Sequence, residues 1–180
     1  MTKEVIKKEY IFTGMEVTTK EEALRAIAER AVELGLCRDV EETYQGFMER
    51  ESQGPTGMQD GFAIPHTRCE SVIQTGIVVM KSTRELEWES FDGKPVQIMI
   101  ALIVPKENYG NEHIQILASL SRMLMKQDFR RKLTETDSAE EIFEVIHQAV
   151  AAECGIWSER GRGPASRHAV CKFCRFCPAG

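Results

Sequence analysis

The sequence predicts an α/β domain in which α-helices flank a mixed β-sheet. Two segments rich in branched apolar residues, 75–80 and 95–105, have the composition of buried strands, and helical patterns occur on either side of them. A third stretch, 86–91, alternates like a half-exposed strand, and Asp92-Gly93 follows it as a hairpin signal. One antiparallel pair among segments separated by helices favours a mixed sheet over a purely parallel one.

Two amphipathic helices are predicted before these strands. The first is capped by Thr19 and stops at Gly35, and the second begins at Asp39. The apolar stripe of the first helix consists of Ala23, Leu24, Ile27, Ala28, Ala31 and Leu34. Because the second helix runs into a polar, glycine-containing loop after Glu51, Arg50 is expected where that helix ends.

Two further helices are predicted after the strands. Asn111 is a good cap for a helix that contains His113 in its first turn, and Ser138 opens the last helix, with the core ending near Ala152. The expected buried stripe of the earlier helix is Ile114, Leu117, Ala118, Ser121 and Leu124, and that of the last helix is Ile142, Val145, Ile146 and Ala149.

Bulk composition indicates one ordinary globular domain, expected at residues 1–152. The chain has 180 residues, of which 42% are hydrophobic, and a net charge of -5, which gives no electrostatic reason to bind nucleic acid or an anionic membrane. The longest apolar run, 98–104, falls far short of the roughly 20 residues that cross a bilayer. The N-terminus lacks the apolar segment of a signal peptide, so we expect a cytoplasmic protein with reduced cysteines.

Residues 153–180 differ in character and are expected to form a disordered, basic extension. They contain five Lys or Arg residues against two Glu, with Gly and Pro interruptions. Their His168, Cys171, Cys174 and Cys177 have ligand-like spacing, which leaves a metal or redox role as the alternative. No short ligand pair stands near His66 or His113, so we expect no metal there and no other cofactor.

His66 is the main candidate for chemistry. The apolar tripeptide 62–64 can lie in the sheet, and Pro65 restricts the backbone, so His66 is delivered rigidly at a strand end. Such an imidazole can present one ring nitrogen to a partner while the other is held by a second acceptor. The alternative is a packed histidine without a chemical role. Cys69, three residues later, suggests a Cys-His nucleophile, but an incidental buried thiol is the simpler interpretation.

The loop before His66 has features of a phosphoryl-binding turn. Gly54, Pro55 and Gly57 predict a bend whose N–H groups, with the hydroxyl of Thr56, can receive phosphoryl oxygens, and Arg50 adds a charged planar donor. For Thr56 the alternative is that its hydroxyl only shapes the turn, and Ser52 is interpreted as structural.

These residues together resemble the enzyme IIA domains of the bacterial phosphotransferase system (PTS), in the fructose and mannitol class that includes the nitrogen-regulatory members. The resemblance rests on Arg50-Glu51, Thr56-Gly57, the segment 63–66 (Ala-Ile-Pro-His) and the His-led segment 113–124, and it covers roughly residues 5–150. It implies a five-stranded mixed sheet flanked by helices.

The resemblance also implies a function and a set of partners. His66 would accept a phosphoryl group from the phosphohistidine of HPr and donate it to a cysteine of an enzyme IIB, with the membrane enzyme IIC involved only indirectly. His113 matches the second active-site histidine of the family and Arg50 its arginine, whereas His113 as a simple helix cap is the alternative. We expect His66 and His113 to face each other across one shallow cleft with Arg50 at its rim.

A second function from another class uses the same histidine. Phosphorylation of His66 adds about two negative charges, which would alter the affinity of a regulatory protein for its partners. The sequence does not identify a sugar, because in this architecture the membrane component recognises it.

Overall fold

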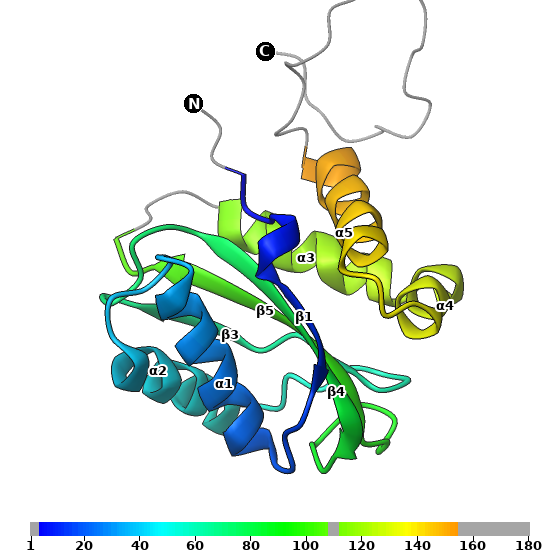
Figure 1. The fold of residues 1–180 in the computed structure, drawn as a ribbon, viewed down its shortest axis with the longest axis horizontal. Helices are drawn as coiled ribbons and strands as arrows, with labels where there is room; N and C mark the ends of the chain where they lie inside the picture. Colours follow the sequence, from blue (N-terminus) through cyan, green and yellow to red (C-terminus); the bar gives the residue numbers. More distant parts are fainter. Residues whose placement is uncertain (1–3, 108–111, 155–180) are drawn as a thin grey trace, which may run out of the picture.

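The computed structural model describes residues 4–107 and 112–154, which form a five-stranded mixed sheet between two layers of helices (Figure 1). The antiparallel strands β4 (Gly76–Leu86) and β5 (Val96–Pro105) form its centre. Strand β1 (Ile11–Met15) pairs in parallel with β4, and two short strands, β2 (Phe62–Ala63) and β3 (His66–Cys69), pair in parallel with the other side of β5. The predicted mixed α/β class is confirmed.

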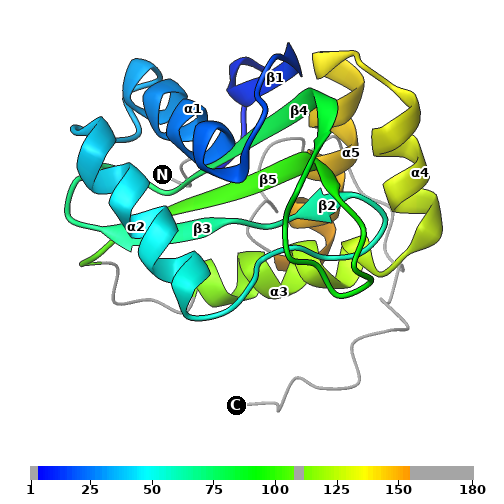
Figure 2. The ribbon, with the colours of Figure 1, turned by 90° about the horizontal axis from the view of Figure 1, so that it is seen from below.

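The helices are divided between the two faces of the sheet, as Figures 1 and 2 show. Helices α1 (Lys20–Glu33) and α2 (Val40–Ser52) cover one face. Helices α3 (Glu112–Leu124), α4 (Gln127–Glu135) and α5 (Ala139–Cys154) cover the other, and a short 3-10 turn, Lys8–Tyr10, precedes β1. None of the described helices is both long and apolar enough to span a membrane.

The apolar residues of β5 alternate between two separate cores. Met99, Ala101 and Ile103 join the core beneath α1 and α2, whereas Ile100 and Leu102 join the core beneath α3 and α5. A strand that is buried on both faces reads as an unbroken apolar run. This is why 95–105 could be recognised as a central strand from its sequence.

Helices α1 and α2 begin as their capping residues predict. Thr19 Oγ1 accepts a hydrogen bond from the backbone N of Glu22 at 3.1 Å, and Asp39 Oδ1 accepts one from the backbone N of Glu42 at 2.7 Å. Helix α2 ends at Ser52, which places Arg50 in its last turn.

The predicted strand 86–91 is wrong. Strand β4 continues through Leu86 instead, and residues 87–95 form the loop that leads to β5. Within this loop Gly93 N donates to Ser90 O at 3.2 Å, so the turn signal lies inside a longer connection. The indole of Trp88 is buried, and Phe91 N bonds to Met58 O at 3.2 Å, so this segment pairs with the loop before β2.

The predicted buried stripe of α3 is also partly wrong. Ile114 is 55% exposed, and the side chains buried against the sheet are Ile116, Leu120 and Leu124. The apolar residues of this helix permit two overlapping stripes, and packing against β5 and α5 selects the later one. The proposed cap Asn111 lies outside the described residues.

The sequence interpretation did not anticipate β1 or α4. Strand β1 is short and only partly buried, and its Gly14 has a φ of 69°, so its apolar alternation is weak. Helix α4 is mostly polar, and it buries only Phe129 and Leu133. The last helix extends to Cys154, two residues beyond the expected end of the core, and the extension from residue 155 onward lies outside the described residues.

Candidate functional site

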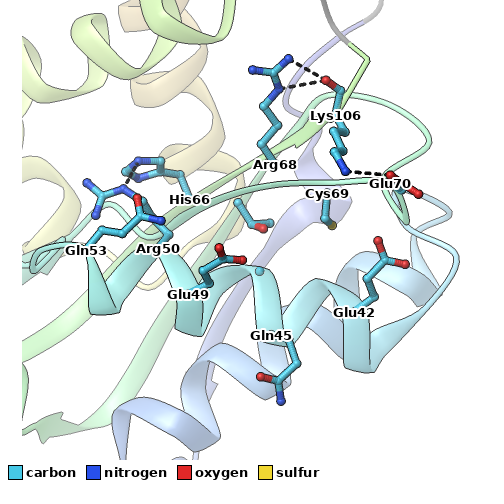
Figure 3. Close-up of a pocket in the computed structure, with 12 residues that line it drawn as sticks. Glu42, Gln45, Glu49, Arg50, Gln53, His66, Arg68, Cys69, Glu70 and Lys106 are labelled. Atoms are coloured by element: carbon cyan, nitrogen blue, oxygen red, sulfur yellow. Dashed lines mark hydrogen bonds and ion pairs between the residues drawn. The ribbon is translucent and has the colours of Figure 1, made fainter.

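The side chains of Arg50 and His66 are in direct contact. Arg50 lies in the last turn of α2 and His66 is the first residue of β3, and Arg50 Nε donates to His66 Nε2 at 2.8 Å (Figure 3). A second donor of the same guanidinium, Nη1, bonds to Gly54 O at 2.8 Å. The arginine is therefore held at both the loop and the imidazole, and its planar group is fixed beside the ring.

The position of His66 follows from the proline before it. Strands β2 and β3 both pair with β5, and Pro65 lies between them. Pro65 has no N–H to donate, but its carbonyl oxygen accepts a hydrogen bond from Leu102 N at 2.9 Å. His66 thus stands at the junction of two short strands rather than at the end of a single strand. Its backbone is fixed on both sides.

The contacts of His66 define the protonation of its ring. Nδ1 lies 3.0 Å from the carbonyl oxygen of Ile64, which can only accept, so Nδ1 carries the hydrogen. Arg50 can only donate, so Nε2 has no hydrogen and directs its lone pair at the guanidinium. The result is a neutral imidazole in which the lone pair of Nε2 is unprotonated and faces Arg50.

Burial is the main cause that lowers the pKa of His66 below its ordinary value of 6.5. The hydrogen bond to Ile64 and the charge of Glu51 raise this pKa, whereas the electrostatic effects of Arg50 and His113 lower it further. The net shift is downward, so the ring is neutral at pH 7.

Thr56 is buried in the loop and its hydroxyl is engaged. Thr56 Oγ1 donates to a carboxylate oxygen of Glu51, and the backbone N of Thr56 contacts the other oxygen at 3.4 Å. The hydroxyl has one hydrogen, so Thr56 must leave Glu51 before it can donate to a phosphoryl oxygen. In this conformation Thr56 shapes the turn.

The expectation of a row of free loop amides is wrong for two of them. Gly54 N donates to Glu51 O at 3.2 Å, and Thr56 N contacts the Glu51 carboxylate. The hydroxyl of Ser52 donates to Glu49 O at 2.6 Å, which agrees with its structural interpretation. The loop is therefore a turn stabilised by its own hydrogen bonds, and the positive charge next to it comes from Arg50 at the end of α2.

A cleft of about 610 Å³ lies between α2 and β3, and Arg50 and His66 stand at one end of it (Figure 3). Its other end carries Arg68 and Lys106, and the Lys106 ammonium pairs with Glu70 at 2.7 Å. The residues that line it are Glu42, Gln45, Gly46, Glu49, Arg50, Gln53, His66, Thr67, Arg68, Cys69, Glu70 and Lys106. His113, half-buried in the first turn of α3, is outside this lining.

The sequence interpretation missed Arg68 as a neighbour of the candidate nucleophile. Successive side chains along a strand point to opposite faces, so Arg68, two residues after His66, emerges on the same side of β3 as His66. This period of two was readable from the sequence. The role of Glu51 in holding Thr56 was not, because it depends on the folded turn.

A thiol nucleophile at Cys69 and a metal site are the alternatives to chemistry at His66. Cys37 and Cys69 are buried free thiols, and burial raises the pKa of each, that of Cys37 to about 11. Such thiols are poor nucleophiles near neutral pH. Within residues 4–107 and 112–154, no group of three or more His, Cys, Asp or Glu side chains is arranged to hold a metal ion. His168, Cys171, Cys174 and Cys177 lie outside that range.

Two components of sugar phosphotransferase systems are similar in sequence to this chain. A fructose-specific EIIA component of the PTS from Haloferax volcanii is 32% identical over 132 residues, which are 73% of this chain and 85% of that protein. A fructose-specific EIIABC component from Bacillus subtilis is 31% identical over 145 residues, which are 81% of this chain. The chain spans only 23% of the length of that second relative.

Solved structures show the same fold. The nitrogen regulatory protein IIA-Ntr from Neisseria meningitidis superposes with a TM-score of 0.72 at 28% identity, covering 79% of this chain and 96% of that one. Enzyme IIA for mannitol from Escherichia coli, in a complex with phosphorylated enzyme IIB, superposes with a TM-score of 0.65 at 26% identity. That match covers 79% of this chain and 98% of the other.

The sequence signature of one family covers nearly all of the described residues. It matches residues 4–149, which include both described histidines of the candidate site and Arg50. The chain belongs to the family described as phosphoenolpyruvate-dependent sugar phosphotransferase system, EIIA 2.

Proposed function

We propose that this protein is a phosphoryl carrier of a PTS, which accepts a phosphoryl group from phospho-HPr on His66 and passes it to a cysteine of an enzyme IIB. The observation that carries this proposal is the contact between Arg50 and a neutral His66 whose Nε2 lone pair is unprotonated. A neutral imidazole is a good nucleophile near pH 7, and its phosphoramidate remains reactive enough to be passed on.

The transfer needs no proton to leave His66. The lone pair of Nε2 attacks the phosphorus and a P–N bond forms to His66, whose ring becomes a phosphoimidazolium because Nδ1 keeps its hydrogen. The P–N bond to the donor imidazole breaks with its electron pair returning to that ring, which holds a hydrogen on its other nitrogen and therefore leaves as a neutral imidazole. Nδ1 keeps its hydrogen and its bond to Ile64 O throughout. In the second step a cysteine thiolate of the acceptor attacks the same phosphorus, and the electron pair of the P–Nε2 bond returns to His66.

Arg50 supplies the charge that the transferred group requires. A guanidinium carries five N–H donors, and Arg50 uses two of them in its contacts with His66 and Gly54. When Nε2 becomes bonded to phosphorus, the donor that pointed at it can turn to a phosphoryl oxygen. Fixed donors of this kind stabilise a loose phosphoryl-transfer transition state without a metal.

His113 and Thr56 have supporting roles in this proposal. We assign His113, whose electrostatic effect lowers the pKa of His66, a role as a donor to the phosphoryl group. Thr56 becomes a donor only after its hydroxyl leaves Glu51, so we assign it a role that depends on loop movement. No cofactor takes part in either step.

The cellular setting follows from the partners. HPr, enzyme IIB and the cytoplasmic side of the membrane component would meet this protein in the cytoplasm, where it acts without inserting in the membrane or binding nucleic acid. We assign this work to residues 1–152 and treat 153–180 as an appendage.

The superposition on a nitrogen regulatory protein favours regulation as a second candidate function. In that case phosphorylation of His66 would change the affinity for a partner rather than feed a transporter. A carrier and a regulator share the first step and differ in the second, so the second step discriminates between them.

The experiment therefore has two stages. The purified protein is incubated with phosphoenolpyruvate, enzyme I and HPr, and intact mass is measured for wild type and His66→Ala. One acid-labile phosphate that is absent from the variant is expected, and no adduct on wild type would overturn the carrier proposal. The phosphorylated protein is then mixed with an enzyme IIB, where transfer to its cysteine supports transport, and retention of the phosphate with altered partner binding supports regulation.

A further inference from the structure

A glycine in the middle of α2 requires an explanation. Gly46 lies near the centre of Val40–Ser52, where glycine is less favourable than alanine for a helix. Its φ is outside the left-handed range, so the backbone alone does not demand glycine. The remaining reason for a glycine at such a position is close approach of another part of the chain.

The neighbour is Thr67, the residue that follows His66. A Cβ atom at position 46 would lie 2.1 Å from Thr67 Oγ1, far below the 3.4 Å at which ordinary van der Waals contact begins. The next nearest atoms are Thr67 Cβ at 3.4 Å and Cys69 Cβ at 3.7 Å, which leave ordinary room. A single oxygen atom therefore excludes a side chain at position 46.

Both residues of this contact are adjacent to the reacting pair. Arg50 is four residues after Gly46 and lies one turn further along the same face of α2. On β3, Thr67 directly follows His66. The spacing of α2 and β3 at Gly46 thus governs whether Arg50 Nε reaches His66 Nε2 at 2.8 Å, and hydrogen bonds weaken steeply when such distances grow.

We propose that the contact between Gly46 and Thr67 sets the separation of α2 and β3, which makes both residues positioning residues for the Arg50–His66 pair. The proposal deepens the proposed function and rests on it for its catalytic consequence. Neither residue touches the phosphoryl group in this scheme. Their effect is exerted through the distance between the guanidinium and the imidazole.

Thr67 is the more rigid member of the contact. Its side chain is 3% exposed, and a β-branched residue in a strand has few alternative χ1 positions. Its Oγ1 is buried without a well-aligned hydrogen bond among the described residues, so removing the oxygen would cost only a weak interaction with the Cys69 thiol, whose pKa it lowers. A methyl group added at position 46 is therefore expected to push α2 away rather than to rotate Thr67.

The test compares four proteins: wild type, Gly46→Ala, Thr67→Ala and the double variant. Gly46→Ala raises helix propensity, so helix formation is preserved while α2 moves away from β3. Its rate of phosphorylation by phospho-HPr is expected to fall by about 10- to 100-fold, since small misplacements of catalytic groups have effects of this size. The double variant is expected to recover most of the lost rate. Thr67→Ala removes the oxygen that clashes with a Cβ atom at position 46, and the methyl group added at position 46 can occupy the space that this oxygen leaves.

A second readout does not depend on phosphoryl transfer. NMR titration of the His66 ring measures its pKa, which the charge of Arg50 and burial both lower. Withdrawal of α2 in Gly46→Ala weakens both causes, so the pKa of His66 should rise, and it should fall back in the double variant. If wild type accepts no phosphate, the proposed function fails, but this titration still decides the positioning role.

Two results would overturn the positioning proposal. One is a Gly46→Ala protein with the wild-type transfer rate and an unshifted His66 titration, which would mean that Thr67 or the helix adapts without moving Arg50. The other is a double variant as impaired as Gly46→Ala, with both folded by circular dichroism. Unfolding of Gly46→Ala together with a folded, active double variant would support the same contact.

Discussion

Arg50 and His66, sixteen residues apart in the sequence, form a hydrogen bond of 2.8 Å between Nε and Nε2. Because arginine cannot accept a hydrogen bond, this contact selects the tautomer in which Nε2 is unprotonated. The same contact brings a permanent positive charge to the atom that would receive a phosphoryl group. Tautomer selection and charge stabilisation thus depend on one side chain.

Two substitutions of Arg50 separate the effect of its positive charge from that of its planar guanidinium. We expect Arg50→Ala to slow phosphorylation by phospho-HPr by about 10²- to 10³-fold, as for other fixed transition-state donors. Arg50→Lys should recover only part of the loss, because an ammonium cannot bond Gly54 and the reacting group with one planar fork. Stopped-flow or quench measurements of the transfer rate check this.

Arg68→Ala is a matched control for that experiment. Arg68 lines the same cleft, but its Nε and Nη2 bond to Lys106 O at 3.0 and 2.6 Å, away from His66. Its removal should have a much smaller effect than that of Arg50. Equal losses in the two variants would indicate a general electrostatic attraction of the donor rather than a specific contact with His66.

The lowered pKa of His66 predicts the pH dependence of phosphoryl acceptance. The ring must be neutral to react, and its pKa in the folded protein lies below 6.5. The acceptance rate should therefore be constant above about pH 6.5 and fall only when the pH drops through the lower, folded-state value. A rate that already declines with a midpoint above 6.5 would contradict the burial of a neutral ring.

The same shift has a consequence for stability. Between the folded-state pKa and 6.5, the unfolded chain binds more protons at His66 than the folded chain, so the free energy of unfolding rises with pH in that window. The contribution of the neutral ring is present above 6.5 and is lost as the pH falls through the folded-state value. Urea titrations at several pH values give the free energy of unfolding of wild type and His66→Gln. Within this window the free energy of unfolding should rise more steeply with pH in wild type, and the same pH dependence in both proteins would refute the link.

Lys81 is expected to stabilise the packing of α4 against the sheet. Its side chain is 10% exposed, and Nζ donates to the carbonyl oxygens of Thr134 and Thr136 at 2.8 and 2.9 Å, at the C-terminal end of α4. Lys81→Met leaves these acceptors without their charged donor and should lower the free energy of unfolding by about 1.5–3 kcal/mol. Urea denaturation measures this change.

The ion pair of Lys81 with Asp137 provides the control for that substitution. Asp137 Oδ1 lies 2.8 Å from Nζ, but its side chain is 81% exposed, so water can replace it. Asp137→Asn should cost less than about 1 kcal/mol. If it destabilises the protein as much as Lys81→Met, the ion pair rather than the carbonyl contacts accounts for the effect.

Gly57 is predicted to be required by space alone. A Cβ atom there would lie 2.2 Å from Glu89 O and 2.9 Å from Ser90 Cα, both backbone atoms that cannot rotate aside. Gly57→Ala should force loop 87–95 outward and destabilise the protein by about 1–3 kcal/mol, a typical cost of overpacking. An unchanged urea midpoint would mean that the loop shifts without penalty.

Local signals in the sequence predicted the parts of the site that depend on neighbouring residues. Pro65 indicated the fixed backbone at His66, and the polar, glycine-containing loop after Glu51 indicated where α2 ends and hence where Arg50 lies. Likewise, the apolar run of β5 indicated a strand buried on both faces. Each of these features is encoded within a few residues of the position it controls.

Features that depend on distant segments could not be read in the same way. The phase of α3 is selected by its packing, and the loop 87–95 pairs with Met58 instead of extending a hairpin. In the folded turn the Thr56 hydroxyl donates to Glu51, whereas the sequence alone allowed it to donate to a phosphoryl group. The glycine at position 46 has meaning only once β3 lies against α2.

The most direct test is to locate the phosphate within the imidazole of His66. The protein is labelled with ¹⁵N, phosphorylated with phospho-HPr and examined by long-range ¹H–¹⁵N correlation and ³¹P NMR, with His66→Ala as the control. We predict a phosphoramidate at Nε2 while Nδ1 keeps its hydrogen and its bond to Ile64 O. Phosphate at Nδ1, or on a residue other than His66, would contradict the assignment of Nε2 as the nucleophile.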